Sequence, residues 1–490
     1  MSTFDLIIVI LYMCGMIAIG VYSRFHIKTV DDFLVAGHRF NTFSLVGTLM
    51  AALVGAGMSL GIVGAAYTYG GGIMWNYIGF AVGLALMALF FVDGMRKTQS
   101  RTVAEIFGSG FGRFPRFCAA CVVVIYSTLL TALTIQGMGR IVTYICNGIG
   151  LNLNITAAVI VCACVVIGYT ALGGLYSVVW TDVVQFCIMF VVIVIVGPII
   201  AIKFGGGFGE LNNAVEITTG GASMFGLFKN VPATYICASF FLVLVSVPGD
   251  PSVPQRALAG NTTTITKRAF AIAAVITVIF GIGLTIIGAT AVKMIPDIEA
   301  TQGTTEAALP MIIILYYPTV LKGLGLAALL AAVMSTISAQ TLIGTTHLCY
   351  DIPRAFKPDL SDDRSKKMLP FAIIIYGLVV TYIALGVESI AGYMYICFSI
   401  CGGGLMAPLL MALYWKKASR IGRGCAIAAG GITVIVMNVI GALGPGGDPF
   451  YLAFIISAIV GIILSLACPG RSSMHGDGSD KAGFEGALVD

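Results

Sequence analysis

Apolar runs of about 20 residues follow one another along nearly the whole chain. A run of this length, wound as a helix, spans the hydrocarbon core of a bilayer. About thirteen such runs are present, at residues 4–23, 43–68, 74–95, 117–139, 155–172, 178–202, 232–249, 270–292, 320–347, 369–387, 391–414, 425–442 and 449–468. The strands of membrane barrels are about half as long and alternate in polarity. The pattern therefore predicts an all-α membrane protein.

The connections between the runs are short and polar. Residues 203–231 and 293–310 are predicted to be outer loops, and the segment from Glu306 to Tyr317 is predicted to be a short outer helix. No connection has room for a nucleotide-binding domain, and no phosphate-binding GxxxxGKS or GxxxxGKT segment occurs. The sequence also shows no HExxH segment and no nucleophile–base arrangement. ATP-driven transport and enzymatic catalysis are therefore not expected.

Composition supports a lipid environment. Hydrophobic residues make up 58% of the chain and charged residues only 10%, whereas soluble domains carry roughly a quarter charged residues. The first run is followed by charged residues such as Arg24 and Asp31 rather than by a small-residue cleavage site, which favours a true span over a signal peptide.

The positive charges predict the orientation. Lysines and arginines accumulate on the cytoplasmic side of membrane proteins. If the runs alternate in direction, all but five of the 27 lysines and arginines fall on one side, and the exceptions are Arg140, Lys203, Lys229, Lys293 and Lys322. We therefore expect a multi-pass protein of the cell membrane with its amino terminus outside and its carboxyl tail in the cytoplasm.

Three polar or glycine-rich segments inside the runs are candidates for chemistry, because polar groups in a bilayer are costly. The first is the stretch 49–61, where Gly55, Gly57 and Gly61 lower the cost of leaving helical geometry. Transporters use such broken helices, whose freed carbonyl groups bind cations. Close helix packing through small residues is the alternative.

The second segment lies in the ninth run. Ala332, Ser335 and Thr336 are spaced i, i+3 and i+4 and therefore share one helix face. Two hydroxyl groups and a carbonyl on one stripe suit a hard cation, which prefers oxygen ligands. Hydrogen bonds from the hydroxyls to carbonyls of their own helix are the alternative.

The third segment enters the sixth run and contains Asp182. A carboxylate at that depth is expected to face the helix bundle and to meet a cation or hydroxyl groups. We interpret it as an ion-binding residue. A structural salt bridge, with Arg256 or another basic residue, is the alternative.

Together these segments resemble the sodium:solute symporter family, which carries sugars, proline, pantothenate and other small organic solutes. The resemblance rests on Gly173-Gly174 with Trp180-Thr-Asp182 and Gln185, on the run from Ala331 to Gln340, on Gln255-Arg256-Ala-Leu-Ala, and on Tyr67-Thr-Tyr-Gly70. These motifs cover the second to the ninth run in order.

The resemblance implies the leucine-transporter fold, in which two five-helix repeats are inverted relative to each other. It divides the chain into a first helix and inner loop (1–40), a first repeat (41–205), an outer loop (206–231), a second repeat (232–424), two further helices (425–470) and a disordered cytoplasmic tail (471–490). The second and seventh spans would be broken. The segment Pro248-Gly249-Asp250-Pro251 fits the break in the seventh.

The resemblance also implies a sodium site between the broken second span and the ninth span. The ligands would be the carbonyls of Ala51, Val54 and Ala332 and the hydroxyls of Ser335 and Thr336. Some relatives hold a second sodium near the position of Asp182, and Ser338 is present for that role. Ala339 stands where those relatives have a further serine, which argues against a second ion.

The solute is expected beside the break. The predicted solute residues are Gly55, Gly57, Met58, Ser59, Asn76, Tyr77, Phe80, Val243 and Val247. Proline carriers have an aspartate where this chain has Leu53, and sugar carriers have polar groups at several of these positions. Pantothenate carriers are closer around Gly64 to Gly70. Arg140 could attract an anion from outside, although an arginine at that depth more often reaches to the interface.

The sequence therefore predicts sodium-coupled symport of a small organic solute, such as a monocarboxylate, an amino acid derivative or a pantothenate-like compound. The alternatives are a proton-coupled symporter that uses Asp182, and a passive facilitator or channel. The expected partners are the solute and the lipid bilayer. Nucleic acid and an obligatory protein partner are not expected.

Overall fold

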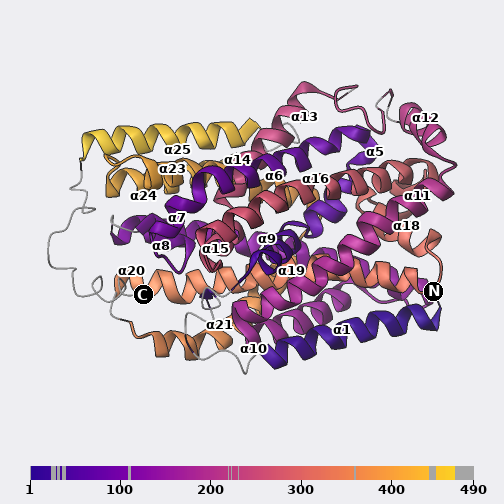
Figure 1. The fold of residues 1–490 in the computed structure, drawn as a ribbon, viewed down its shortest axis with the longest axis horizontal. Helices are drawn as coiled ribbons and strands as arrows, with labels where there is room; N and C mark the ends of the chain where they lie inside the picture. Colours follow the sequence, from indigo (N-terminus) through magenta and orange to yellow (C-terminus); the bar gives the residue numbers. More distant parts are fainter. Residues whose placement is uncertain are drawn as a thin grey trace.

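The computed structural model is a bundle of membrane-length helices, and it confirms the all-α class (Figure 1). It describes residues 2–469 apart from 24–28, 30–33, 36–39, 109–111, 219, 222, 230, 358–359 and 441–447. Eleven helices in the described part are long and apolar enough to cross a membrane, and two bent pairs raise the number to 13. Most of the predicted inner loop and the predicted tail lie outside the described residues.

The spans follow one another with few interruptions. In chain order their elements are α1 (Thr3–Ser23), α3 (Thr42–Leu53), α4 (Ile62–Gly64), α5 (Ala66–Tyr69), α6 (Met74–Leu86), α7 (Val92–Lys97), α9 (Arg113–Gly148), α10 (Ile155–Met189), α11 (Gly197–Phe204), α13 (Ala233–Cys237), α14 (Val243–Gly249), α15 (Ser252–Ala259), α16 (Thr263–Met294), α19 (Leu321–Thr346), α20 (Ile352–Phe356), α21 (Asp362–Ala384), α22 (Ile390–Ser399), α23 (Met406–Tyr414), α24 (Arg420–Val439) and α25 (Asp448–Ala467). The shorter connecting helices are α8 (Val103–Gly108), α12 (Phe208–Thr218), α17 (Ile298–Gln302) and α18 (Ala308–Tyr316).

Both spans that the sequence marked as broken are bent. Residues Thr42–Leu53 meet Gly57–Gly64 at 62°, and residues Ala233–Gly249 meet Ser252–Ala259 at 45°. At the first break Val54 leaves helical geometry, with φ −83° and ψ 58°, and two glycines follow within three residues. At the second break Pro251 cannot donate a backbone hydrogen bond, so the helical ladder is interrupted there.

A third interruption separates the fifth and sixth spans. Gly174 has φ 50° and ψ −159° inside α10, a conformation that side chains with a Cβ rarely adopt. The helix therefore divides there into Ile155–Leu172 and the span that begins at Gly174 and runs to Phe204.

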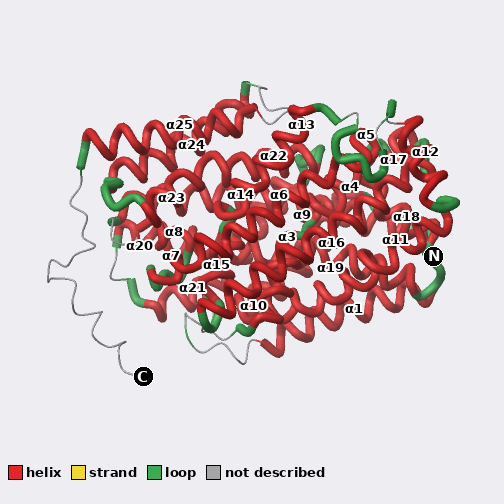
Figure 2. The backbone as a smooth tube through the Cα atoms, turned by 45° about the horizontal axis from the view of Figure 1, so that its top comes forward, coloured by secondary structure: helices red, strands yellow, loops and turns green. Residues whose placement is uncertain are grey.

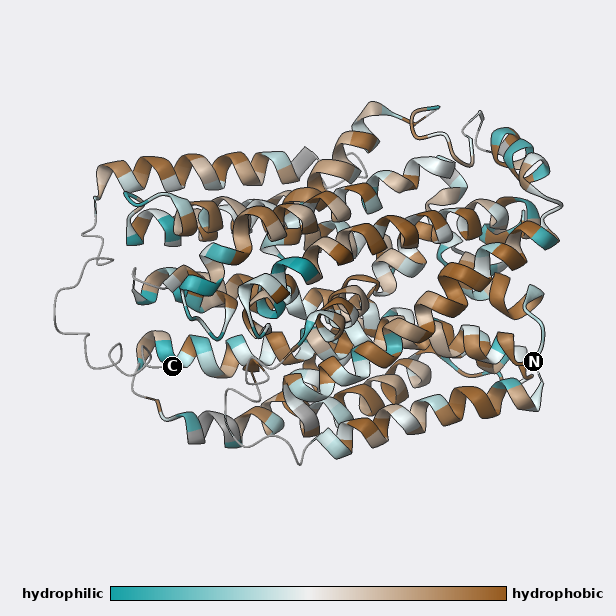
Figure 3. Ribbon diagram, viewed as in Figure 1, coloured by the Kyte–Doolittle hydropathy of each residue, from teal (hydrophilic) through white to brown (hydrophobic). Residues whose placement is uncertain are grey.

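Helix α19 occupies the centre of the bundle. Its membrane-spanning window is entirely buried, whereas the windows of α1 and α25 are only 28% buried and lie at the periphery. Figure 2 shows α19 between the other helices, with α1 and α25 on opposite sides. Hydrophobic residues dominate along the helices, and hydrophilic ones gather toward the two ends (Figure 3). We call the end where α1 begins the N face and the other end the opposite face.

The connections on the N face contain more helix than the sequence predicted. Within the predicted loop 206–231, the helix α12 buries Leu211 and Val215 against Met224 and Ala289. Leu211 and Val215, one helical turn apart, are the sequence feature that indicates this helix. The many glycines around them favoured the prediction of a loop instead. The predicted short outer helix from Glu306 to Tyr317 is present as a turn at Thr305–Ala307 followed by α18.

Glycines let the helices approach closely at several crossings. A Cβ on Gly281 of α16 would lie 2.6 Å from the Cβ of Tyr77 on α6, whereas a Cβ on Gly168 of α10 would meet nothing within 4 Å. Both glycines are helical, so an alanine at either position gains the same backbone propensity. The crossing of α6 and α16 thus depends on the missing side chain of Gly281.

We expect Gly281→Ala to lower the free energy of unfolding by about 1–3 kcal/mol, as overpacking of a core typically does. Gly168→Ala is the matched control and should be neutral or stabilising by about 0.5–1 kcal/mol. Thermal unfolding of the purified protein in detergent measures both. Equal melting temperatures for the two variants would show that this crossing is not tightly packed.

Candidate functional site

The break in the first bent span lies against α19. The hydroxyl of Ser335 donates to the carbonyl of Ala51 at 2.8 Å and to that of Ala332, on its own helix, at 2.9 Å. The hydroxyl of Thr336 lies 3.4 Å from the carbonyls of both Ala52 and Ala332. All five residues are buried. Five oxygen atoms from two helices therefore converge at one point in the middle of the bundle.

Two features of the sequence make this approach possible. The helix α3 ends at Leu53, so its last carbonyls lack partners from a following turn. A Cβ on Gly55 would lie 2.4 Å from Oγ1 of Thr336, and only glycine leaves room for that side chain. Bonding of the hydroxyls to their own helix, the alternative that the sequence left open, is therefore only part of the arrangement, because each hydroxyl also contacts a carbonyl of α3.

The oxygens suit a hard cation. They are uncharged, and the carbonyl end of α3 adds the negative pole of a helix dipole. Cations of this kind prefer oxygen ligands. Among the described residues no group of three or more His, Cys, Asp or Glu side chains could hold a metal ion, so the donor set does not resemble a transition-metal site.

The predicted ligands are brought together in part. Ala51, Ala332, Ser335 and Thr336 meet as the resemblance implied. Val54 lies at the break itself, where its N–H bonds back to Met50. The carbonyl of Ala52 was not predicted from the sequence. It lies toward Thr336 because of the direction in which the first span bends.

Asp182 is fully buried and contacts both bent spans. Its Oδ2 accepts a hydrogen bond from the hydroxyl of Thr48 at 2.5 Å and lies 3.1 Å from Nη2 of Arg256. Arg256 also donates from Nε to the carbonyl of Thr48 at 3.0 Å and from Nη1 to the carbonyl of Ser252. The salt bridge that the sequence left as an alternative is present. Ser338 donates to the carbonyl of Ser335 on its own helix.

A small cavity adjoins the first break. It encloses about 30 Å³ and is lined by Ala52, Leu53, Gly55, Ala56, Gly57, Met58, Phe80, Tyr126, Leu130, Thr134, Asp250, Thr336, Met394 and Phe398. A buried water needs roughly 10–15 Å³ of such space, so an organic solute enters only when the surrounding helices separate. Of the predicted solute residues, Gly55, Gly57, Met58 and Phe80 line this cavity.

The other predicted solute residues are not among those that line the cavity in this structure. The hydroxyl of Ser59 donates to the carbonyl of Gly55, and the hydroxyl of Tyr77 donates to that of Met58. The amide of Asn76 lies 3.4 Å from the hydroxyl of Tyr235. Val243 and Val247 pack against Gly79 and Gly83 of α6. These residues pack around the residues that line the cavity. The sequence alone could not distinguish the two groups.

The wall also contains residues that the sequence did not single out as solute contacts. Tyr126 of α9 is entirely buried, and Asp250 stands between α14 and α15 at the second break. Met394 of α22 presses against Gly57, where a Cβ would lie 2.2 Å from its sulfur. The buried carboxylate was the available signal, because charged groups inside a membrane usually have a function.

On the N face an ion pair joins α9 to the segments before α18 and α22. Arg140 of α9 pairs with Glu306, and it also donates to the carbonyl of Glu388. The second carboxylate oxygen of Glu306 accepts from the N–H of Ala391, at the start of α22. Arg140 therefore joins three segments rather than extending to the interface.

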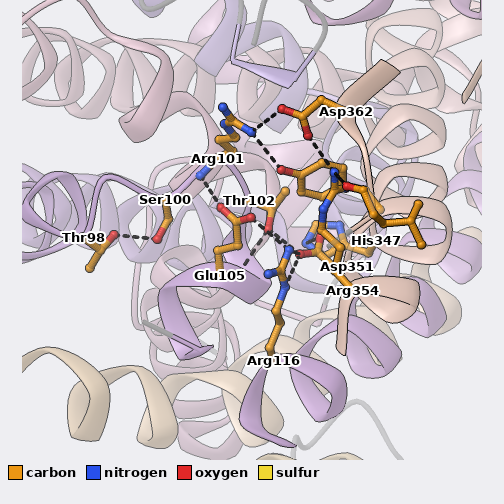
Figure 4. A network of polar contacts seen from close by, with 12 residues as sticks. Thr98, Ser100, Arg101, Thr102, Glu105, Arg116, His347, Asp351, Arg354 and Asp362 are labelled. Atoms are coloured by element: carbon orange, nitrogen blue, oxygen red, sulfur yellow. Dashed lines mark hydrogen bonds and ion pairs between the residues drawn. The ribbon is translucent and has the colours of Figure 1, made fainter. Parts of the chain in front are cut away.

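The opposite face has a larger network (Figure 4). Arg116 lies between Glu105 and Asp351, at 2.9 Å and 2.8 Å. Burial raises the pKa of Glu105, and the guanidinium of Arg116 acts in the other direction. A second pair of arginines, Arg101 and Arg354, shares the carboxylate of Asp362. This network ties α8, α9, α20 and α21 into one unit.

Comparison with known proteins is consistent with these features. The model of the sodium:solute symporter family matches residues 33–430. The osmoregulated proline transporter OpuE of Bacillus subtilis is 25% identical, with 93% of each chain covered. The sodium/pantothenate symporter of Haemophilus influenzae is 28% identical over 84% of this chain and 86% of that protein. The high-affinity choline transporter 1 of Drosophila melanogaster is 27% identical over 79% and 62%.

Solved structures show the same fold. A sodium-coupled sialic acid symporter, in a substrate-bound outward-open state, superposes with a TM-score of 0.79 at 20% identity, covering 96% of this chain and 99% of that one. MhsT in complex with L-phenylalanine superposes with a TM-score of 0.53 at 15% identity, covering 87% and 98%. The leucine-transporter fold expected from the motifs is confirmed.

The buried pair of Asp182 and Arg256 yields a stability prediction. Asp182→Asn leaves the guanidinium of Arg256 buried without its counter-charge, and we expect a loss of about 3–5 kcal/mol. The control is Asp93→Asn, whose carboxylate is 45% exposed and pairs with Lys267; such a surface pair contributes about 0–1 kcal/mol. Thermal unfolding compares them. A loss for Asp182→Asn no greater than the control's would contradict the assignment of a tight buried pair.

Proposed function

The chain belongs to the sodium:solute symporter family, and we propose that its coupling ion binds where the hydroxyls of α19 meet the broken end of α3. Sodium is the coupling ion of this family, and small organic solutes are its cargo. The division into inverted repeats at 41–205 and 232–424 is part of the same proposal. The observation that carries it is the convergence of Ser335 and Thr336 on the carbonyls of Ala51 and Ala52.

The proposed ligands are the carbonyls of Ala51, Val54 and Ala332 and the hydroxyls of Ser335 and Thr336. Their geometry supports the assignment because a hydroxyl that now donates to a carbonyl can turn its oxygen toward a cation between them. The ion would then replace hydrogen bonds of similar direction and join the same two helices. Asp182 and Ser338 remain the proposed ligands of a second ion, although the pairing of Asp182 with Arg256 supports a structural role.

Coupling follows from where these ligands reside. Two of the five, Ala51 and Val54, belong to the first bent span, and the other three belong to α19, so the ion has its full set of ligands only when the two are close. Sodium therefore favours the conformations in which the break touches α19, and an ion can shift an equilibrium only through such differential binding. The solute cavity is lined by Thr336, one of the proposed ion ligands, and by Ala52 and Gly55, which lie against it; this shared wall links binding of the solute to binding of the ion.

Alternating access would separate the two faces in turn. On the N face the link of Arg140 and Glu306 would part, and on the opposite face the contacts of Arg256 with Thr48 and Asp182 would part. The cavity of about 30 Å³ lies between these two closures. Because Asp182 has a paired cation, its charge is balanced, which favours sodium over a proton carried by Asp182.

We further propose that the N face is extracellular and the opposite face cytoplasmic, in a cell membrane. The distribution of lysines and arginines along the sequence supports this orientation. The network of Arg101, Arg116 and Arg354 lies on the opposite face, as it would on the cytoplasmic side.

The sodium site is tested by Ser335→Ala/Thr336→Ala. Loss of two of five ligands should raise the sodium concentration for half-maximal uptake at least tenfold, because each lost oxygen ligand removes ion binding but little packing. The measurement is solute uptake into proteoliposomes against sodium concentration. Thr277→Ala is the control, since its buried hydroxyl bonds only to its own helix and to the sulfur of Met50.

The design has two contrary outcomes. If uptake reaches its full rate without sodium, transport is not coupled to sodium and the proposed function is contradicted. Unchanged sodium dependence in the double variant, with normal insertion, moves the ion away from Ser335 and Thr336.

Orientation is tested by thiol labelling of intact cells. Glu299→Cys places a thiol at an exposed position of α17 on the N face, and a membrane-impermeant maleimide should label it without permeabilisation. The native Cys468, exposed beyond the end of α25, should react only after permeabilisation. The reverse pattern would invert the proposed topology.

A further inference from the structure

The solute cavity has one carboxylate in its wall. Of the residues that line it, Asp250 alone has an acidic or basic side chain. Its position, between α14 and α15, is the break in the second bent span, so it faces the break of the first span across the cavity. Only 7% of Asp250 is exposed. A charge buried to this degree needs a partner.

The surrounding protein compensates the carboxylate of Asp250 only in part. One oxygen, Oδ1, accepts the N–H of Ser252 at 2.8 Å, which caps the start of α15. No lysine or arginine of the described residues forms an ion pair with Asp250. Arg256 lies nearby on α15, but its guanidinium forms hydrogen bonds with Asp182, Thr48 and the carbonyl of Ser252. The pair of Asp182 and Arg256 is neutral, so Asp250 has no ion-pair partner of its own among the described residues, although the hydroxyls of Ser252 and Tyr126 and the charge of Arg256 lie near it.

The rest of the wall suits a cation with an apolar body. Three aromatic rings line the cavity, and those of Phe80 and Phe398 meet edge to face with centroids 5.6 Å apart. The third ring, Tyr126, is entirely buried, and its hydroxyl lies near the carboxylate of Asp250. The faces of aromatic rings attract ammonium groups, and cages of such rings bind quaternary ammonium ligands. Met58 and Met394 complete an adaptable apolar surface.

We propose that the solute carries a positively charged nitrogen, an ammonium or quaternary ammonium group, which Asp250 and the rings of Phe80, Tyr126 and Phe398 hold. This inference rests on the proposed function, because it names the solute class of the same cavity. A zwitterion fits as well as a simple cation, since the start of the second half of the first bent span presents a positive helix end near Gly57. Simple monocarboxylates and pantothenate-like anions do not fit, because Asp250 repels them.

Two other roles for Asp250 make different predictions. If Asp250 were a sodium ligand, its neutralisation would abolish the response of the protein to sodium alone. If it served only to cap α15, asparagine would replace it without effect on the solute, because asparagine is an equally good cap. Asp250→Asn therefore separates recognition of the solute from both alternatives.

The experiment measures the melting temperature of the purified full-length protein with and without sodium. The probes are choline and glycine betaine, which have a quaternary nitrogen, and pantothenate, which is an anion. We expect at least one of the two quaternary probes to stabilise the protein in sodium, and pantothenate not to. In Asp250→Asn the concentration of that probe for half-maximal stabilisation should rise about tenfold or more, while stabilisation by sodium alone stays as in the unchanged protein.

Two variants act as controls. Asp93→Asn removes a carboxylate far from the cavity, on α7, and should bind the probe as the unchanged protein does. Asp250→Glu keeps the charge and should bind the quaternary probe better than Asp250→Asn does. The retained response to sodium shows that each variant is folded.

The remaining outcomes contradict either the proposed solute class, the role of Asp250 or the proposed sodium coupling. Stabilisation by pantothenate alone, by no probe, or by a quaternary probe equally in Asp250→Asn overturns the assignment of the solute class. Loss of the sodium response in Asp250→Asn reassigns the residue to the ion. A quaternary probe that binds equally with and without sodium, and more weakly in Asp250→Asn, keeps this inference and contradicts the proposed coupling.

Discussion

A helix that ends inside a bilayer leaves carbonyl groups without partners, and this constraint organises the centre of the molecule. No water is available there to satisfy them. In this chain the hydroxyls of Ser335 and Thr336 reach across from α19 to the carbonyls of Ala51 and Ala52. Glycine at position 55 permits the contact, because a side chain there would collide with Thr336. An ion with a preference for oxygen finds at the same place the groups that the broken helix has released.

Much of this arrangement could be predicted from the sequence. Span positions follow from the length of the apolar runs, and the breaks follow from the glycines after Val54 and the prolines around Asp250. The stripe of Ala332, Ser335 and Thr336 follows from helical periodicity. Each of these features is local, so a single segment contains the information. Even α12, the short helix within the first outer loop, could be recognised from Leu211 and Val215, two apolar residues one helical turn apart.

What could not be predicted depends on how distant segments cross. Tyr77 and Asn76 were predicted as solute contacts and do not line the cavity in this structure: Tyr77 packs against Gly281 of α16, and the amide of Asn76 lies beside the hydroxyl of Tyr235. Tyr126 lines the cavity although its own segment resembles any apolar helix. Arg140 has no local partner in sequence, and its carboxylate, Glu306, lies 166 residues further along. Such pairings belong to the tertiary structure alone.

The guanidinium of Arg256 touches three separate pieces of the protein: Thr48 in the first bent span, Asp182 in α10, and the turn of α15 from which it projects. A single side chain thus connects the halves of both bent spans that lie toward the opposite face to the helix beside them. Its bonds support one another, and giving up one of them exposes the remaining charges. We therefore expect these contacts to part together, which would leave few half-open arrangements. In a carrier, such coupled contacts would limit the intermediate states in which ions cross the membrane without solute.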